Sequence, residues 1–499
     1  MSTESIYKQI LKGTGTYSIA LMGSRMASFL LLPVYTRFLT PADYGVLELL
    51  ELTTFIFIAL VGMRIGDALF YYYAGASTAE AKEKAICTVL LGAALMGVAG
   101  GIIGWSGASL LSRLVFQTER YTPGFRLVFT TFAFSVPVEA GFCYLRALNR
   151  SSAYVAASLA RLGLGIVCNV LLLSLGLGMY AMLWSSLIVT AILAVYLGTT
   201  ALAGMSIPAR FDRGLLKQFL RYSAPLGGSA LGMFVINYGD RFFLARYCPL
   251  SDLGIYSLAY KFGMLITYIQ TPFDVYWRSQ MFTIVQEPNG ETIYVRVATY
   301  LTLGLTFVTL LLTLFIDPAL RVTVPPAFQA AAQYVPWIAA AYLIRTIGAH
   351  FRCVFLLEGT TGKEFQATTA GAVACLAGYA ILIPTFKLWG AVASTLLGFG
   401  TMFVIGLWQA QKLRRFAFEY RRMILEVLVA AVIGATFSFI RPANPWMALS
   451  LALLGVACYP LVLWISGFAY PDEITDIRAI FGVPLKRVFL RLMMGNQRA

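Results

Sequence analysis

Apolar runs separated by short polar stretches follow one another along almost the whole chain. The stretch from Tyr17 to Tyr73 sets the pattern, because an apolar run, a polar break over residues 36–45 and a second apolar run follow in order. Each run holds about 20 or more mainly apolar residues, the length that an α-helix needs to cross roughly 30 Å of hydrocarbon. The pattern therefore predicts helices that span a membrane.

The same pattern predicts fourteen spans and hence an all-α polytopic membrane protein. Six spans precede a polar connector near residues 208–221, and eight follow it. In the third span, glycines 97 and 101 and glycines 100 and 104 have the Gly-x-x-x-Gly spacing that lets two helices pack closely. The expected spans lie near residues 14–38, 46–72, 86–111, 125–146, 153–175, 178–201, 222–246, 254–283, 293–316, 333–357, 366–384, 389–410, 423–440 and 446–468.

The first two-helix segment has a counterpart half a chain later. Residues 17–18 match residues 222–223 at an offset of 205 (222 − 17), and residues 43–46 match residues 252–255 at an offset of 209 (252 − 43). The difference of four residues is about one helical turn and can be absorbed within a helix. Six helices between the two copies would make both run in the same direction through the membrane, which predicts a parallel internal repeat.

Composition and charge support the membrane class. Hydrophobic residues make up 59% and charged residues 12% of the 499 residues, and the mean hydropathy is +0.75. Ordinary soluble domains carry about a quarter charged residues, so composition excludes that class. The net charge of +15 comes mainly from short loops, where Lys and Arg set membrane orientation. We therefore expect both termini in the cytoplasm and no nucleic-acid partner.

The tail from residue 471 to residue 499 mixes apolar and basic positions. Two interpretations stay open for it. It is expected either to lie as an amphipathic helix on anionic headgroups or to be a solvated tail.

The sequence carries no catalytic or metal-binding motif. Its seven cysteines are spread singly and form no Cys-x-x-Cys pair, which argues against a disulfide framework and a zinc site. A Walker lysine loop, a Gly-x-Ser-x-Gly elbow and a His-Glu-x-x-His helix are absent from the sequence. We expect a protein that is not an enzyme and has no resident cofactor or metal. Uphill transport would then draw on an ion gradient, the membrane potential or consumption of the product.

Ionisable residues inside or near the predicted spans form the candidate site. The cationic candidates are Arg25, Arg64, Arg161, Arg241, Lys261, Arg278, Arg345 and Arg352. The acidic candidates, for ion coupling or for pairing with an arginine, are Asp67, Glu139, Asp240 and Asp274. An unpaired charge is costly at this depth, so the excess of cations predicts an anionic ligand. Guanidinium groups suit phosphate oxygens because they offer paired donors.

Structural alternatives stay open for several of these residues. Arg64 with Asp67, and Asp274 with Arg278, have the spacing of ion pairs within one helix. Glu139 is expected to be either the partner of one arginine or a proton or cation site.

Depth separates the remaining candidates. Arg241 and Lys261 lie near a predicted outer boundary and Arg352 near the inner one, where snorkelling to headgroups is a common alternative. The single histidine, His350, is expected to be a packing residue rather than a pH switch. Three deeper arginines are the strongest ligand candidates, namely Arg25, Arg161 and Arg345.

Three sequence segments carry a family resemblance. Residues 15–18, residues 32–45 and the second-half segment from 238–244 to 252–257 resemble the polysaccharide-repeat flippases (O-antigen and exopolysaccharide) of the multidrug/oligosaccharidyl-lipid/polysaccharide exporter superfamily. The resemblance implies two six-helix lobes around a central cavity, with two C-terminal helices outside that core. We accordingly expect an N-lobe over 1–205, a C-lobe over 206–413, two further spans over 414–470 and the tail over 471–499.

The resemblance also implies a substrate and a location. An undecaprenyl-pyrophosphate-linked oligosaccharide would be turned over from the cytoplasmic to the periplasmic leaflet of a bacterial inner membrane. Lipid II flippases of the same superfamily use cavity arginines on the first, second and eighth spans, loosely comparable with Arg25, Arg64 and either Lys261 or Arg278. The polymerase and co-polymerase of the same pathway are further candidate partners.

The alternative function is a drug or small-cation exporter of the same architecture. In that case Asp67, Glu139 or Asp274 would be the coupling site for Na⁺ or H⁺. The excess of positive charge argues against a cationic cargo. A membrane glycosyltransferase or polymerase would need a large extramembrane loop with carboxylates, which the predicted spans leave no room for.

Overall fold

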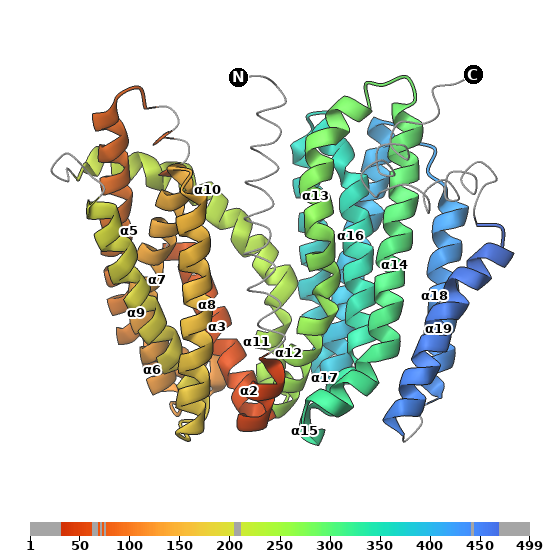
Figure 1. Cartoon of the computed structure of the whole chain (residues 1–499), viewed down its shortest axis with the longest axis horizontal. Helices are drawn as coiled ribbons and strands as arrows, with labels where there is room; N and C mark the ends of the chain where they lie inside the picture. Colours follow the sequence, from red (N-terminus) through yellow and green to blue (C-terminus); the bar gives the residue numbers. More distant parts are fainter. Residues whose placement is uncertain are drawn as a thin grey trace. The chain divides into compact units, whose positions relative to one another are not determined.

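The computed structural model describes residues 31–61, 68–69, 72–73, 76–203, 211–440 and 444–468, and every regular element in these ranges is a helix (Figure 1). This confirms the predicted all-α class. The chain divides into two compact units, Met1–Ser257 and Leu258–Ala499. The four-part division expected from the sequence stays a prediction.

Unit 1 is built around α7 (Thr122–Ala147), which packs against five neighbouring helices. Phe125, Phe129 and Phe132 of α7 are completely buried in its core. The described helices of this unit are α2 (Leu32–Phe38), α3 (Pro41–Val61), α5 (Ala79–Ser106), α6 (Ala108–Phe116), α7, α8 (Ser151–Ser174), α9 (Met179–Ala203), α10 (Arg213–Tyr238), α11 (Asp240–Tyr247) and the start of α12 (Leu250–Gly263).

Small residues bring α5 and α7 close together. A methyl group added at Gly97 would lie 3.2 Å from the Pro137 ring, and one added at Gly101 would lie 3.1 Å from the Ala133 methyl group. At Gly104 the added group would overlap the Phe129 ring. The structure thus confirms that the Gly-x-x-x-Gly spacings of this span serve helix packing.

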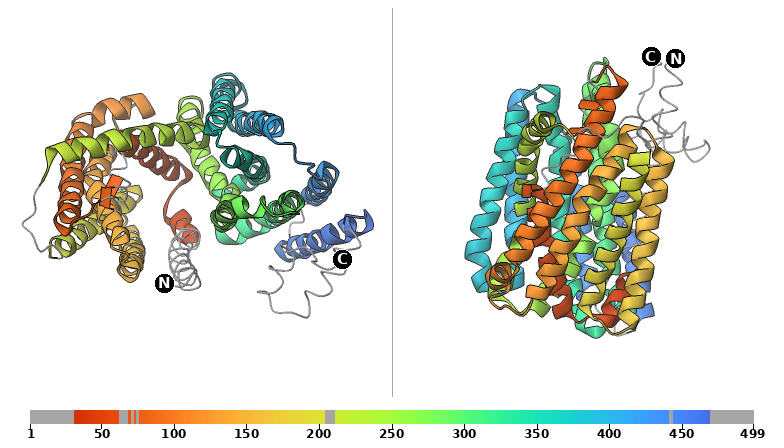
Figure 2. Two further views of the ribbon diagram at one scale, coloured as in Figure 1. Left: turned by 90° about the horizontal axis from the view of Figure 1, so that it is seen from above. Right: turned by 90° about the vertical axis from the view of Figure 1, so that its left-hand side faces the viewer.

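Unit 2 is organised around α14, which packs against α13, α16, α18 and α19. Seen along the helix axes, α18 and α19 lie beside α14 (Figure 2). The elements of this unit, after the end of α12, are α13 (Leu265–Ile284), α14 (Gly290–Thr323), α15 (Pro326–Gln329), the 3₁₀ helix η1 (Ala330–Gln333), α16 (Val335–Leu357), α17 (Thr361–Leu413), α18 (Tyr420–Phe439) and α19 (Pro445–Ile465).

The helix α17 is two spans joined by a sharp break. Lys387 has φ 50° and ψ −123°, a backbone conformation outside the helical region. The break falls between the predicted spans 366–384 and 389–410, so the sequence pattern places both correctly.

Eight described helices are long and apolar enough to cross a membrane, as the sequence pattern predicts. Most of the first predicted span lies outside the described residues, and the count of fourteen stays a prediction. The eight are Ala79–Ser106, Thr122–Ala147, Ser151–Ser174, Met179–Ala203, Gly290–Thr323, Val335–Leu357, Gly362–Leu413 and Trp446–Ile465.

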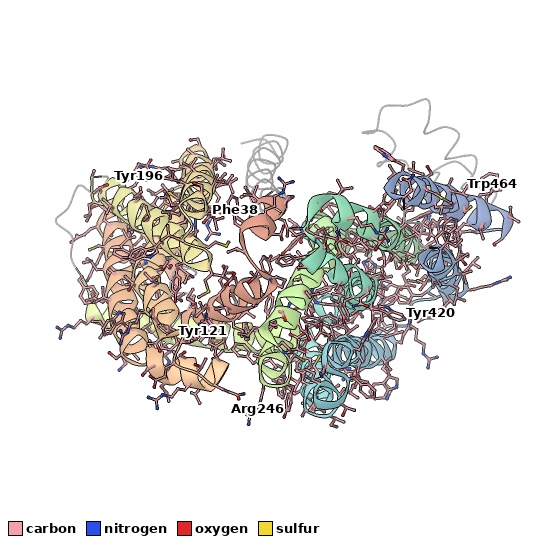
Figure 3. The ribbon with its side chains drawn as sticks, turned by 90° about the horizontal axis from the view of Figure 1, so that it is seen from below. Phe38, Tyr121, Tyr196, Arg246, Tyr420 and Trp464 are labelled. Atoms are coloured by element: carbon pink, nitrogen blue, oxygen red, sulfur yellow. The ribbon has the colours of Figure 1, made fainter. Side chains whose placement is uncertain are left out.

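The outer faces of these helices are apolar. Tyr196 of α9 and Trp464 of α19 are 51% and 60% exposed, and Figure 3 shows both at the periphery of their helices. Val195 and Leu95 are likewise more than half exposed. Such faces suit contact with lipid, where exposed apolar surface carries no hydration cost.

The predicted internal repeat is visible in the helix boundaries. The short helix α2 ends at Phe38 and α3 begins at Pro41, while α11 ends at Tyr247 and α12 begins at Leu250. Both pairs of positions differ by 209 residues (247 − 38 and 250 − 41), the offset expected from residues 43–46 and 252–255.

Candidate substrate site

One face of α13 carries the polar residues of the candidate site. Thr267, Gln270, Asp274 and Arg278 follow at intervals of three, four and four residues, so they share one side of the helix. Pro272 lies inside α13 and leaves it without one main-chain hydrogen bond. The same helix packs against α16, which carries Arg345.

Gln270 ties α13 to α16. Its side chain is 5% exposed, and its amide nitrogen donates to Asp274 Oδ1 at 2.9 Å and to the Thr346 carbonyl at 3.4 Å. This double contact fixes the Asp274 carboxylate beside the α16 backbone.

Arg345 reaches across to α13 without an acidic partner. Its Nη1 donates to the Thr267 hydroxyl at 3.4 Å, and its guanidinium lies 5.6 Å and 5.7 Å from the ring centres of Tyr342 and Phe399. Within the described chain, Arg345 forms no ion pair within 4.0 Å. A half-buried guanidinium on a neutral hydroxyl keeps donors available for an anion.

Arg278 lies one turn beyond Asp274, and its side chain is exposed. The pairing of Asp274 with Arg278 within the helix, one of the sequence-based alternatives, does not form in this structure: among the described residues Arg278 makes neither an ion pair nor a hydrogen bond. Arg278 and Arg345 both act electrostatically on the Asp274 carboxylate. The guanidinium groups of Arg278 and Arg345 therefore share the single Asp274 carboxylate. The polar site between α13 and α16 thus carries one positive charge in excess.

Arg352 lies seven residues after Arg345 but is already neutralised. Its Nε donates to Glu364 Oε1 and Oε2 of α17 at 3.2 Å and 3.0 Å, and the side chain is 6% exposed. The snorkelling interpretation of Arg352 is therefore wrong, because the guanidinium is buried against a carboxylate of the next helix.

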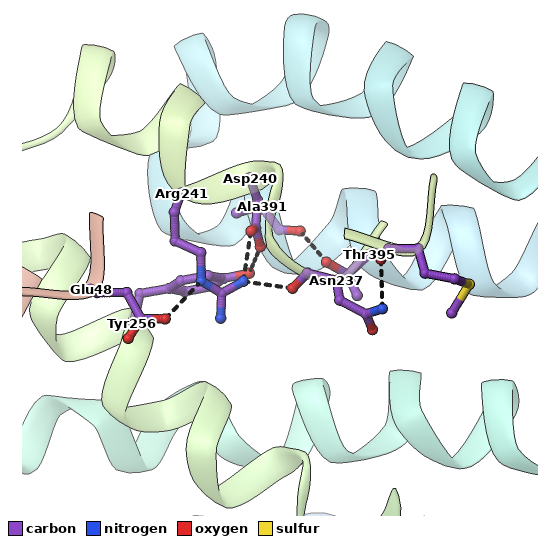
Figure 4. Close-up of polar contacts among 8 residues, drawn as sticks. Glu48, Asn237, Asp240, Arg241, Tyr256, Ala391 and Thr395 are labelled. Carbon is purple, nitrogen blue, oxygen red and sulfur yellow. Dashed lines mark hydrogen bonds and ion pairs between the residues drawn. The ribbon is translucent and has the colours of Figure 1, made fainter. Parts of the chain in front are cut away.

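Arg241 belongs to a buried network in unit 1 (Figure 4). Its Nη1 donates to Asp240 Oδ1 at 2.7 Å and to the Asn237 carbonyl at 2.9 Å, and its Nε lies 3.5 Å from Glu48 Oε1. The Tyr256 hydroxyl donates to the other Asp240 oxygen at 2.5 Å. The network joins α3, α11 and α12, so we assign Arg241 and Asp240 to the packing of this unit.

The interpretation of Arg241 as a snorkelling residue is wrong, because its side chain is 1% exposed. Lys261, the other boundary candidate, is exposed on α12.

Glu139 of α7 pairs with Arg161 of α8 at 3.2 Å. Glu139 is thus the partner of an arginine, one of the two roles predicted for it. Both side chains are well exposed, at 63% and 44%, and Arg161 carries no excess charge beyond this pair. Arg25, Arg64 and Asp67 lie outside the described residues.

His350 is completely buried in an aromatic setting. Its ring centre lies 5.0 Å from that of Trp277 and 4.9 Å from that of Tyr294. Neither ring nitrogen has a hydrogen-bond partner among the described residues. These contacts agree with the predicted packing role.

Several polar residues around these charges were not among the candidates from the sequence. Glu48 and Glu364 lie near the ends of predicted spans. A carboxylate at such a position is usually taken to belong to the loop rather than to the membrane interior. Thr267 and Gln270 could have been found, because they share the helical face of Asp274 and Arg278.

A cavity of about 670 Å³ lies between α14, α16, α18 and α19. Its wall is mainly apolar and includes Leu310, Leu314, Trp337 and Ala430. Asp317 also lines it and pairs with Arg321, at 2.8 Å between their closest charged atoms. The lining has the chemistry for a hydrocarbon chain rather than for a charged ligand.

Comparisons with known proteins give a match to one protein family and a match in fold. A family model described as "Polysaccharide biosynthesis protein" matches residues 10–274, just over half of the chain. A comparison with curated protein sequences finds no match.

Solved structures show the same fold. A structure titled "Lipid II flippase MurJ, inward closed conformation" has 13% identity and a TM-score of 0.71, covering 91% of this chain and 99% of that one. An inward-facing multidrug resistance MATE family transporter of the MOP superfamily has 16% identity and a TM-score of 0.64, covering 81% and 99%. An outward-facing one has 16% identity and a TM-score of 0.56, covering 80% and 95%.

Proposed function

The chain belongs to the polysaccharide biosynthesis protein family, as its sequence motifs predicted, and from this premise we propose that it is a flippase for a lipid-linked oligosaccharide. The proposed substrate is an undecaprenyl-pyrophosphate-linked repeat unit, moved from the cytoplasmic to the periplasmic leaflet of a bacterial inner membrane. The proposed function is transport without catalysis, and the polymerase and co-polymerase of the pathway are proposed partners.

The observation that carries this proposal is the excess positive charge between α13 and α16. Among the described residues, Arg345 and Arg278 have no carboxylate of their own, and Asp274 is shared between them. A pyrophosphate would supply the missing negative charge and accept from both guanidinium groups. Thr267 and Gln270 would orient the arginine and the carboxylate around it.

The apolar cavity beside α18 and α19 supports the same substrate class. A polyprenyl chain needs an apolar surface while its headgroup is held by cations. The lining residues Leu310, Leu314 and Trp337 offer such a surface. Alternating access, with Na⁺ or H⁺ as the coupling ion, is the proposed mode of transport.

The experiment is a flipping assay in proteoliposomes with a fluorescent undecaprenyl-pyrophosphate-linked oligosaccharide. Arg345→Gln and Arg278→Gln are each expected to reduce transport about 10- to 100-fold, since a hydrogen bond to a charged group contributes about 1.5–3 kcal/mol. Arg414→Gln is the matched control, because Arg414 pairs with Glu291 in unit 2 and neither residue lines the apolar cavity. Full activity of the two α13–α16 variants would contradict the proposal.

An exporter of drugs or small cations is the second candidate. The Asp274 carboxylate and the fold shared with MATE transporters favour it. Efflux of a cationic dye by the same proteoliposomes, together with no flipping, would identify this function instead.

A further inference from the structure

The helix α18 carries one carboxylic acid in an otherwise apolar stretch. Glu426 is 0% exposed, and neither carboxyl oxygen has a hydrogen-bond partner among the described residues. A buried carboxylate anion without a partner is very unfavourable in a low-dielectric interior. The neutral acid needs no counter-ion and avoids most of this cost.

The arginine one turn earlier is held by another carboxylate. Arg422 Nη1 donates to Glu419 Oε2 at 2.9 Å, and the Arg422 guanidinium lies 4.5 Å from the Phe468 ring centre. Glu419 also accepts from the Thr299 hydroxyl of α14 at 2.8 Å. The charge of Arg422 is therefore balanced at the end of α18, one turn away from Glu426.

In the part of the chain that the structure describes, no hydrogen bond or ion pair joins α14 or α19 to the Glu426 carboxyl group. From α19, the Tyr459 hydroxyl donates to the main-chain carbonyl of Glu426 at 3.4 Å rather than to its carboxyl group. From α14, Tyr300 faces Arg422, with the guanidinium 5.9 Å from the ring centre. Both are tyrosines and are uncharged near neutral pH.

Two neighbours of Glu426 on α18 line the apolar cavity. The next residue, Val427, lines this cavity, and so does Ala430, one helical turn further on the same face of α18. A separation of α18 or α19 from α14 at this point would expose the carboxyl group to whatever fills the cavity.

We propose that Glu426 is a proton-binding site. It holds a proton while α14, α18 and α19 are packed together, and it releases that proton when these helices separate enough to admit water. The ligand is a proton alone, and the site lies outside the arginine cluster of α13 and α16. The inference does not depend on the proposed lipid-linked substrate.

Infrared spectroscopy of the full chain in lipid nanodiscs tests this site. At pH 7 the wild-type protein is expected to show a protonated-acid C=O band, equivalent to one carboxyl group, that Glu426→Gln lacks. Glu291→Gln is the matched control, because Glu291 pairs with Arg414 away from Glu426: it should lose carboxylate absorption and keep the acid band. An unchanged acid region in Glu426→Gln, with loss of carboxylate absorption instead, would overturn the proposal.

Two further measurements keep the test decisive. Glu426→Asp retains an acid, so it should shift the C=O band rather than remove it, even if Glu426→Gln folds poorly. Raising the pH should lower the thermal stability of the wild-type protein more than that of Glu426→Gln, because only the wild-type protein can create a buried anion there. Parallel pH profiles for the two proteins would count against the site.

Discussion

Gly45 and Gly254 lie against each other at equivalent positions of the internal repeat. A methyl group added at Gly45 would lie 3.1 Å from the Gly254 nitrogen, and one added at Gly254 would lie 3.1 Å from the Gly45 nitrogen. The added groups would also overlap the carbonyl oxygens of Leu250 and Pro41. The first turns of α3 and α12 thus approach each other in a reciprocal way that depends on the absence of side chains.

Replacing either glycine by alanine is expected to destabilise the protein. The methyl group meets main-chain atoms, which cannot move aside as a flexible side chain does, and such overpacking costs about 1–3 kcal/mol. Gly254→Ala should therefore lower the unfolding temperature in detergent. Gly163→Ala is the control, because the site in α8 has no atom within 4 Å and alanine favours a helix. Equal unfolding temperatures for both variants would refute the close contact.

The buried Arg241 network gives a second prediction. Arg241→Met should reduce the free energy of unfolding by about 3–5 kcal/mol, because the Asp240 carboxylate would stay buried without its cation. The double variant with Asp240→Asn should recover part of this loss. Denaturant titration in mixed micelles measures both.

Arg113→Met is the matched control for this network. It breaks a well-exposed ion pair with Glu119 outside the candidate spans, and such pairs contribute about 0–1 kcal/mol. A loss as large as that of Arg241→Met would contradict the distinction between the buried and the exposed pair.

The helices were predictable because a helix that faces lipid has a long apolar run in its sequence. The bounds Thr122–Ala147 and Ser151–Ser174 differ by three residues or fewer from the predicted 125–146 and 153–175. The 209-residue offset of the repeat could also be predicted from the sequence, because the matching residues lie in the turns between helices and can be recognised without knowing how the helices pack.

The pairing of charges was not predictable to the same degree. Hydropathy gives the depth of a charge but not the rotation of its helix, and rotation decides that Arg352 meets Glu364. The contact of Arg241 with Glu48 joins residues 193 positions apart (241 − 48), so no helical spacing signals it. The polar face of α13 could be predicted from its helical spacing. Which of its charged residues stay unpaired could not be predicted, because that depends on how α16 packs against it.

Removing the carboxylate of the α13 site should separate the two candidate functions. Asp274→Asn keeps the hydrogen bond with Gln270 possible and removes the negative charge between Arg278 and Arg345. Flipping of a pyrophosphate carrier should be retained, with a KM that is unchanged or lower, because the carboxylate no longer competes with the phosphate. Export of a cation would be lost in the same variant. Paired assays of flipping and dye efflux measure the two outcomes.

Asp212 provides a pH-dependent prediction outside the spans. It caps α10 by accepting from the Leu215 N–H at 3.0 Å and pairs with Lys84 of α5 at 2.6 Å. The hydrogen bond from Lys84, together with the backbone N–H of Leu215, holds the pKa of Asp212 below its ordinary value of 3.8. Since the folded-state pKa is lowered, this contribution to stability is present above about pH 4 and is lost as the pH falls through the folded-state pKa.

The wild-type protein should therefore show a higher unfolding temperature than Asp212→Asn at pH 7, and the difference should shrink in acid. Lys84→Met removes the ion pair but keeps the cap. Its unfolding temperature at pH 7 should therefore fall less than that of Asp212→Ala, which loses both the ion pair and the cap. Differential scanning fluorimetry from pH 7 down to about pH 3 gives the profile. A deficit of Asp212→Asn that stays constant down to the lowest pH would mean that the carboxylate charge contributes nothing, because a contribution from this charge must shrink as the carboxylate is protonated.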